Sequence, residues 1–452
     1  MNRALPVEHN QNQIQARASA PTGVSNVSAT QVSNRTPGFL QGLFLLLPIT
    51  LAVIGVSVFS VSVPMMQAHF RNVTWFGSPT IAGSPAGDYM VNLLQTMPGF
   101  WIVAFSPVAG WLADKFGRRT ILLWSMVIYA VAGTAPYVLD EIYTILFTRC
   151  LVGMCESVIL TITTTMLCDY FKGAARERWL ASQTGTASLS ALVIIPLGGI
   201  LAGALGWHGP FLVYLYSLLL FFFVLIFCWE PPHEAPDAAE IAKVDSEARY
   251  QTMPWARMVG IILITVVASV MFYSTITQNA NAFLALKLDP SQLSFYMTVA
   301  SLGVPIGTVL FWGLARLHIG LLLFIDFMLI GTGFTWMSMA TPDKIWGYVF
   351  ATNLQQIGCG LVLPTLLVWA TRGLAYRIRG RGNGLWQGAF GIGLFISGAT
   401  LTFLGSHLGG LIPAFGVLGK VCFVAAAIAI VSKLIWGRNA LPASAADKPA
   451  LH

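Results

Sequence analysis

The chain has 452 residues, of which 56% are hydrophobic and only 10% are charged. A soluble domain carries about 25% charged residues, so an aqueous fold cannot hide this much apolar surface, and a water-soluble globular protein is excluded. The net charge is +7, but the basic residues are scattered over separate short segments and not gathered on one face, which argues against a nucleic-acid partner.

Residues 1–38 are rich in Asn, Gln, Ser and Thr. They lack an apolar core long enough for a cleavable signal peptide. We therefore expect a disordered cytoplasmic tail that precedes the first apolar run.

Runs of roughly 20 mostly apolar residues predict transmembrane helices. Four runs are plain, at 39–66, 120–137, 212–229 and 418–436. Weaker runs lie near 89–113, 142–168, 180–206, 254–286, 291–315, 318–340, 345–370 and 384–408. The sequence therefore predicts an all-α protein with about twelve membrane-crossing helices. Because the runs are continuous and do not alternate, a β-barrel is excluded.

The orientation follows from the Lys and Arg residues of the short loops, which favour the cytoplasmic side. Placing both termini in the cytoplasm puts most of them inside: Lys115, Arg118, Arg119, Lys172, Arg176, Arg178, Arg372, Arg377, Arg379, Arg381, Lys433 and Arg438. Two termini on one side require an even number of spans. We expect a multi-pass protein of the inner (plasma) membrane.

The only long polar stretch inside the chain is 230–253, which contains three prolines and six acids. We interpret it as a cytoplasmic linker between a six-helix half at 39–229 and a second half at 254–437, with a short cytoplasmic tail at 438–452. Two halves joined in this way are typical of transporters built from repeats.

The strongest local signal is GWLADKFGRR at 110–119, at the predicted cytoplasmic end of the second span. Gly110 would let another helix approach closely. Asp114 and Arg118 are four residues apart and can pair if that turn stays helical. Gly117 permits a tight reversal into the third span.

This segment resembles the major facilitator superfamily, whose loop between helices two and three carries G-x-L-A-D-R-x-G-R-R; only Lys115 departs from that pattern. The resemblance implies two six-helix halves, transport of a small molecule by alternating access, and a cytoplasmic latch between the halves. The implied latch residues are Gly110, Asp114, Gly117, Arg118, Arg119 and, pairing with Arg118 from the end of the fourth span, Asp169. The alternatives are a basic loop that only sets orientation and a solvated acid at a helix end.

Arg149 and Glu156 lie in the fourth span, seven residues apart, so they project from one helical face about 10 Å apart along the axis. Ionisable residues at membrane depth are costly and by default mark a pathway or a proton site. Desolvation favours the protonated form of a carboxyl group, and a nearby Arg favours the ionised form. A movement of the two halves could therefore switch the carboxyl between these forms. We expect Glu156 to carry a proton and Arg149 to be its partner or a contact for a substrate anion. The alternative is a static buried ion pair.

Other sequence features bear on the direction of transport. The R-x-x-x-G pattern at 149–153 with the added Glu156 resembles the spinster-like and organic-anion branches of the family. The fifth span is rich in small residues and contains Pro196, and 195–199 partly resembles the G-P-x-x-G-G signature of antiporters, which favours export. The first span has no charged residue, which lowers the expectation of cationic-drug efflux.

Amide side chains in the second half suggest a substrate cavity, because amides in lipid need hydrogen-bond partners. The candidates are Gln278, Asn279 and Asn281 in the seventh span, Asn353 and Gln356 in the tenth, and Gln387 in the eleventh. A packing role is the alternative for all six. Asp326 in the ninth span is a second buried acid that we rank below Glu156.

The sequence contains no phosphate-binding, metalloprotease or serine-hydrolase motif, and its six cysteines are not at metal-ligand spacing. We therefore expect no enzymatic activity, cofactor or metal, and a monomer whose partners are a small solute, protons and the lipid bilayer. The leading hypothesis for the function is proton-coupled export of a drug, siderophore or metabolite. Proton-coupled uptake of an organic acid and a non-transporting receptor or scaffold remain open.

Overall fold

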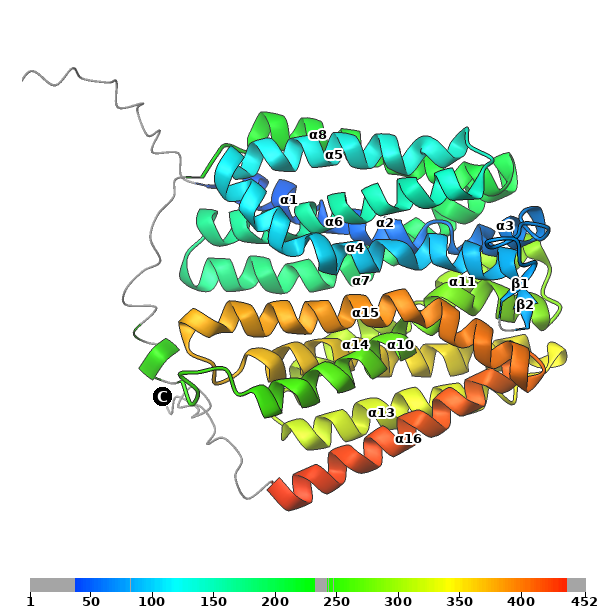
Figure 1. Cartoon of the computed structure of the whole chain (residues 1–452). Coiled ribbons are helices and arrows are strands. Elements are labelled where there is room, and N and C mark those ends of the chain that lie inside the picture. The colour runs from blue at the N-terminus through cyan, green and yellow to red at the C-terminus, as the bar shows by residue number, and fades with distance from the viewer. Residues whose placement is uncertain (1–36, 82, 232–241, 243, 247, 437–452) are drawn as a thin grey trace, which may run out of the picture. The chain divides into compact units, whose positions relative to one another are not determined.

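The computed structural model describes residues 37–81, 83–231, 242, 244–246 and 248–436, which form almost entirely helices. Most of the two predicted tails, at 1–38 and 438–452, and half of the predicted linker lie outside the described residues. Figure 1 shows long helices lying side by side, with the blue and cyan helices grouped apart from the orange and red ones.

The first predicted span is a run of short helices: α1 (Phe39–Leu46), α2 (Ile49–Ser57), the 3-10 turn η2 (Ser60–Ser62) and α3 (Val63–His69). Pro48 ends α1 because a proline has no backbone N–H to continue the helical ladder. A short β-hairpin follows, in which β1 (Thr80–Ile81) pairs antiparallel with β2 (Ser84–Pro85). Between α3 and α4, the described residues thus form no compact domain.

Seven helical elements complete the part of the chain before the linker. They are α4 (Ala86–Phe116), α5 (Arg118–Thr134), η3 (Ala135–Tyr137), α6 (Ile142–Tyr170), α7 (Gly173–Leu205), η4 (Gly206–Leu215) and α8 (Tyr216–Phe227). At the start of α6, the hydroxyl and amide of Thr144 donate to the exposed carboxylate of Glu141, and these bonds hold the pKa of Glu141 below its usual value.

The part after the linker is built in the same way. Its elements are α10 (Trp255–Ala285), η5 (Pro290–Gln292), α11 (Leu293–Ala300), α12 (Gly303–Leu314), α13 (Ile319–Met337), η6 (Pro342–Lys344), α14 (Ile345–Thr371), α15 (Tyr376–Leu408) and α16 (Leu411–Trp436).

The described residues contain 11 helical stretches long and apolar enough to cross a membrane. One of them, Arg178–Phe227, has 50 residues, which at about 1.5 Å per residue is far longer than one crossing needs. It contains α7 and the η4–α8 helix, which meet at Gly206 with φ +71°. A Cβ at Gly209 would overlap the Leu201 carbonyl, so η4 folds back on α7. Counting these two helices separately brings the candidate spans of the described residues to twelve, the number that the sequence predicts.

Buried apolar residues form two main clusters. One draws on residues between Leu45 and Cys228, and the other draws mostly on residues between Ala268 and Ala429, with Val61 and Ile195 added. The boundaries of the two halves stay a prediction.

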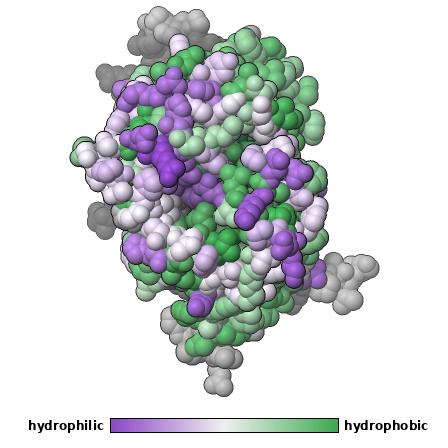
Figure 2. Space-filling model, turned by 90° about the vertical axis from the view of Figure 1, so that its right-hand side faces the viewer, coloured by the Kyte–Doolittle hydropathy of each residue, from purple (hydrophilic) through white to green (hydrophobic). Residues whose placement is uncertain are grey.

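The helix bundle has two ends, which we name by residues near them. We call the end where α4 begins the Asp88 end and the end where α5 begins the Arg118 end. Figure 2 looks onto the end that carries the hairpin, which is the Asp88 end, where hydrophilic residues gather among apolar ones.

Candidate transport site and gates

Glu156 of α6 is buried, with 1% of its surface exposed. Its carboxyl group packs against Gly55 of α2, where an added Cβ would overlap it. Neither carboxyl oxygen accepts a hydrogen bond from any described residue. An ionised carboxylate without hydrogen bonds or a partner is very costly to bury, so the geometry suits the neutral, protonated acid.

Arg149 does not pair with Glu156 in this structure. Its Nη1 donates to the Tyr214 hydroxyl at 2.7 Å, and its Nη2 donates to the Gly133 carbonyl at 3.2 Å. The guanidinium also lies 5.2 Å from the ring centre of Phe211, a spacing at which an aromatic face attracts a cation. The static ion pair that was the alternative interpretation is therefore absent between these two residues, because neutral acceptors and aromatic faces already surround the fully buried arginine.

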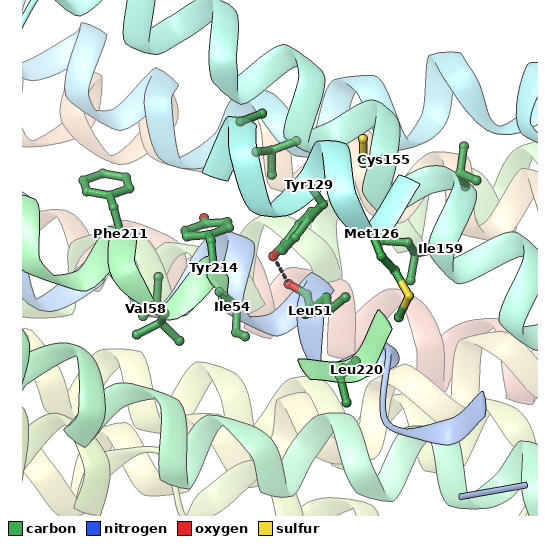
Figure 3. Close-up of a cluster of buried hydrophobic side chains, with 14 of the residues drawn as sticks. Leu51, Ile54, Val58, Met126, Tyr129, Cys155, Ile159, Phe211, Tyr214 and Leu220 are labelled. Carbon is green, nitrogen blue, oxygen red and sulfur yellow. Dashed lines mark hydrogen bonds between the residues drawn. The ribbon is translucent and has the colours of Figure 1, made fainter. Parts of the chain in front are cut away.

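Two tyrosines that sequence reasoning missed build this region. Figure 3 shows Tyr129 of α5 donating from its hydroxyl to the Leu51 carbonyl of α2, at 2.6 Å, with Tyr214 beside it. The ring centres of Tyr129 and Tyr214 lie 5.2 Å apart. The available signal was chemical: a buried arginine needs acceptors, and a tyrosine in an apolar span can supply one.

Hydrogen bonds among Asn92, Gln278 and Thr402, which we call the Asn92 seam, join helices far apart in sequence near the Asp88 end. The Oδ1 of Asn92 in α4 accepts from Gln278 Nε2 in α10 at 2.8 Å. Its Nδ2 donates to Thr402 Oγ1 in α15 at 2.7 Å. One amide therefore ties three helices together, and Gln278 belongs to this seam.

Below the seam, α4 and α15 touch through glycines. A Cβ at Gly391 would meet the Gly99 carbonyl at 2.9 Å, and a Cβ at Gly99 would meet the Leu394 side chain at 2.7 Å. Small residues allow this close approach of helices. The sequence analysis passed over Asn92 and both glycines.

The other predicted cavity amides are mostly engaged within the second part of the chain. Asn281 donates to Gln278 Oε1 at 2.9 Å, and Gln356 donates to Thr275 Oγ1 at 2.7 Å. The Tyr348 hydroxyl donates to Asn279 Oδ1 at 2.8 Å, and Asn353 donates to the Val299 carbonyl at 3.0 Å. Gln387 is exposed on α15. These contacts match the packing interpretation, and a role in substrate binding stays a prediction.

The motif at 110–119 lies at the Arg118 end. Gly117 has φ +89°, the left-handed region that favours glycine, and separates α4 from α5 as expected. The helix is therefore interrupted between Asp114 and Arg118, so the unbroken helical turn that their pairing requires is not formed. Arg118 instead forms an ion pair with Asp169, as the family resemblance implies. A Cβ added at Gly110 would meet nothing within 4 Å, so no helix among the described residues approaches this glycine closely.

Glu230, which follows α8, caps the start of α5. Its Oε1 accepts from the Arg118 amide at 2.6 Å, and its Oε2 accepts from the Arg119 amide at 2.8 Å. Arg119 also donates from Nη2 to the Leu225 carbonyl at 2.7 Å. A carboxylate at a helix N-terminus satisfies free amides and complements the helix dipole. Sequence reasoning placed Glu230 in the linker and missed this contact.

Asp245, also from the predicted linker, caps another helix. Its Oδ1 accepts from the Tyr376 amide at the first residue of α15, at 2.8 Å. The amide of Tyr250 donates to the Gly373 carbonyl at 3.0 Å. Asp245 and Tyr250 therefore hold their part of the linker against the loop between α14 and α15 and the start of α15.

Glu230→Ala is expected to lower the melting temperature of the purified protein, because the change leaves two amides of α5 without acceptors. Loss of a side-chain cap costs about 0.5–2 kcal/mol. Glu230→Gln keeps one carbonyl acceptor and should melt between the wild type and Glu230→Ala. Equal melting temperatures for all three proteins would show that the cap adds no stability.

The helices described above define an all-α, multi-pass membrane protein. The sequence profile of the Major Facilitator Superfamily matches residues 45–375, and the chain belongs to this family of transporters. The resemblance inferred from the motif at 110–119 is confirmed.

Curated relatives match shorter stretches. Probable anion transporter 4, chloroplastic, of Arabidopsis thaliana is 28% identical over 117 residues, which are 25% of this chain and 22% of that protein. Multidrug export protein EmrB of Escherichia coli K12 is 25% identical over 150 residues, 33% of this chain and 29% of that protein. The chain thus matches less than a third of the length of these relatives.

Solved structures match the fold over most of the chain. A bacterial homolog of the human lysosomal transporter Spinster, in an inward-facing and unoccupied conformation, superposes with a TM-score of 0.67. The match covers 89% of this chain and 98% of that one, at 16% identity. At this identity the likeness concerns the fold alone.

Proposed function

We propose that this transporter exports a small organic solute across the inner membrane in exchange for protons, with Glu156 as the proton carrier. The observation that carries the proposal is a buried carboxyl on α6 whose two oxygens accept no hydrogen bond from described residues. Such a group is stable when protonated and becomes costly when it loses the proton. A change that admits water or a cation to Glu156 would release the proton.

Alternating access needs a contact that closes one end and can open. We infer that the Asn92 hydrogen bonds, which join α4 to α10 and α15, and the contact of α4 with α15 through Gly99 and Gly391 hold the Asp88 end closed. At the Arg118 end, no described residue packs against Gly110 of α4. We infer that the Arg118–Asp169 pair and the Glu230 cap keep the first half rigid while the halves move, so that the motif acts as the proposed latch in the opposite state.

Uptake of an organic anion is the second candidate, favoured by the similarity to a probable anion transporter and by Arg149. Arg149 is fully enclosed and hydrogen-bonded to Tyr214. An anion would therefore have to replace these contacts to reach it. Export remains the leading proposal, supported by the close packing of α7 through Gly198 against the Val58 carbonyl and by the similarity to a multidrug export protein.

The test uses the full chain in proteoliposomes that contain a pH-sensitive dye. Ethidium, 2,3-dihydroxybenzoate and lactate represent the drug, siderophore and organic-acid classes. With a proton gradient imposed in either direction, an exporter should couple outward solute movement to inward proton movement. Co-movement of lactate and protons in the same direction would favour the uptake candidate. Proton fluxes equal to those of protein-free vesicles for all three solutes would count against both.

A further inference from the structure

A cavity of about 640 Å³ lies within the first part of the chain, between α2, α7 and the η4–α8 helix. Its size falls within the roughly 300–1,000 Å³ typical of small-molecule sites. Thr50 and Ile54 form its α2 wall, Ser190 and Val193 its α7 wall, and Val213 part of its η4 wall. Glu156 and the predicted cavity amides do not line it.

The lining offers little to a polar ligand. It contains no charged side chain. The Thr50 hydroxyl donates to the Leu47 carbonyl at 2.8 Å, and the Ser190 hydroxyl donates to the Ala187 carbonyl at 2.8 Å. Thr186 and Tyr216 add two further hydroxyls, and the remaining eight lining side chains are apolar, so the walls best suit an apolar occupant.

The mouth of the cavity opens between exposed apolar side chains of α7. Leu189 is 57% exposed, Val193 68% and Leu197 40%, and all three line the cavity. They lie inside a helical stretch long and apolar enough to cross a membrane. In the bilayer this mouth therefore faces hydrocarbon, where acyl chains are the abundant apolar groups.

We propose that this cavity binds one acyl chain of a bilayer phospholipid. The chain enters between Leu189 and Leu197 and lies against α2 at Thr50 and Ile54. The headgroup stays outside the cavity, since the lining has no charge to hold it.

The cavity wall is directly connected to the proposed proton site, a step that rests on the proposed function. Ile54 lines the cavity, and the next residue, Gly55, packs on the Glu156 carboxyl. Val213 lines it, and the next residue, Tyr214, holds Arg149. An acyl chain in the cavity supports both walls and so favours the packing seen around Glu156.

The test is photolabelling of the full chain in nanodiscs that contain phosphatidylethanolamine with a diazirine in one acyl chain, followed by peptide mapping. Label is expected on α2 at 50–54. Ser190→Trp fills the cavity and should abolish that label. Ile200→Trp, a matched change at a 67% exposed position of α7 outside the lining, should keep it.

Several results would overturn the proposal. Equal labelling of α2 in both variants would do so, as would stronger labelling by a diazirine-bearing free fatty acid than by the phospholipid. If Ser190→Trp does not fold, Leu197→Trp at the mouth takes its place with the same expectation. Because the readout is binding and not transport, its failure is distinct from a failure of the proposed proton coupling.

Discussion

Glu156→Gln is expected to reduce gradient-driven solute flux to the level of protein-free vesicles while solute exchange without a gradient continues. The amide has nearly the shape of the protonated acid, so the packing against Gly55 should persist. The amide cannot release a proton, so the coupling step is lost. The measurement is flux in proteoliposomes with and without an imposed proton gradient.

The chain provides a matched control in Asp326 of α13. This side chain is also fully buried, and neither of its carboxyl oxygens accepts a hydrogen bond from described residues. Asp326 differs from Glu156 in its place, because α13 packs mainly against α14 and α16 within the second part of the chain and not at the contact of α4 with α15. Asp326→Asn should therefore keep gradient-driven flux. If both variants lost coupling equally, Glu156 would have no special role; if Glu156→Gln kept full coupling, the proposed proton carrier would be wrong.

Gly391→Leu is expected to open the Asp88 end. The new side chain would meet the Gly99 carbonyl at 2.9 Å, and a backbone atom cannot move aside as a flexible side chain can. Overpacking of this kind costs about 1–3 kcal/mol, and each 1.4 kcal/mol is about a tenfold change in a population ratio. Spin labels at the exposed Ser78 and Ser406, in a background without the six native cysteines, should report longer distances.

Gly384→Leu is the control on the same helix, since a Cβ at Gly384 has nothing within 4 Å. It should leave the distance distribution unchanged. A wild-type distribution for Gly391→Leu would mean that the glycine contact does not hold this end closed. Asn92→Ala, which removes two hydrogen bonds without adding volume, should give a smaller shift in the same direction.

The sequence predicted the helices well because each one is a local property of an apolar run. The run at 212–229 and the run at 180–206 appear as two helices that meet at Gly206. The motif at 110–119 led to the family and to the contact between Arg118 and Asp169. Even so, the break at Gly117 removed the unbroken helical turn that the pairing of Asp114 with Arg118 requires.

What a sequence alone determines here is which residues enter the membrane and which of them are ionisable. Composition and run length are enough for that, since lipid accepts few charges. Tertiary structure decided which hydrogen-bond partners the polar groups have. Arg149 donates to Tyr214 and does not pair with Glu156. The first amides of α5 donate to Glu230, which lies 111 and 112 residues away in the sequence. Such partners depend on which helices lie side by side, and no local periodicity encodes that.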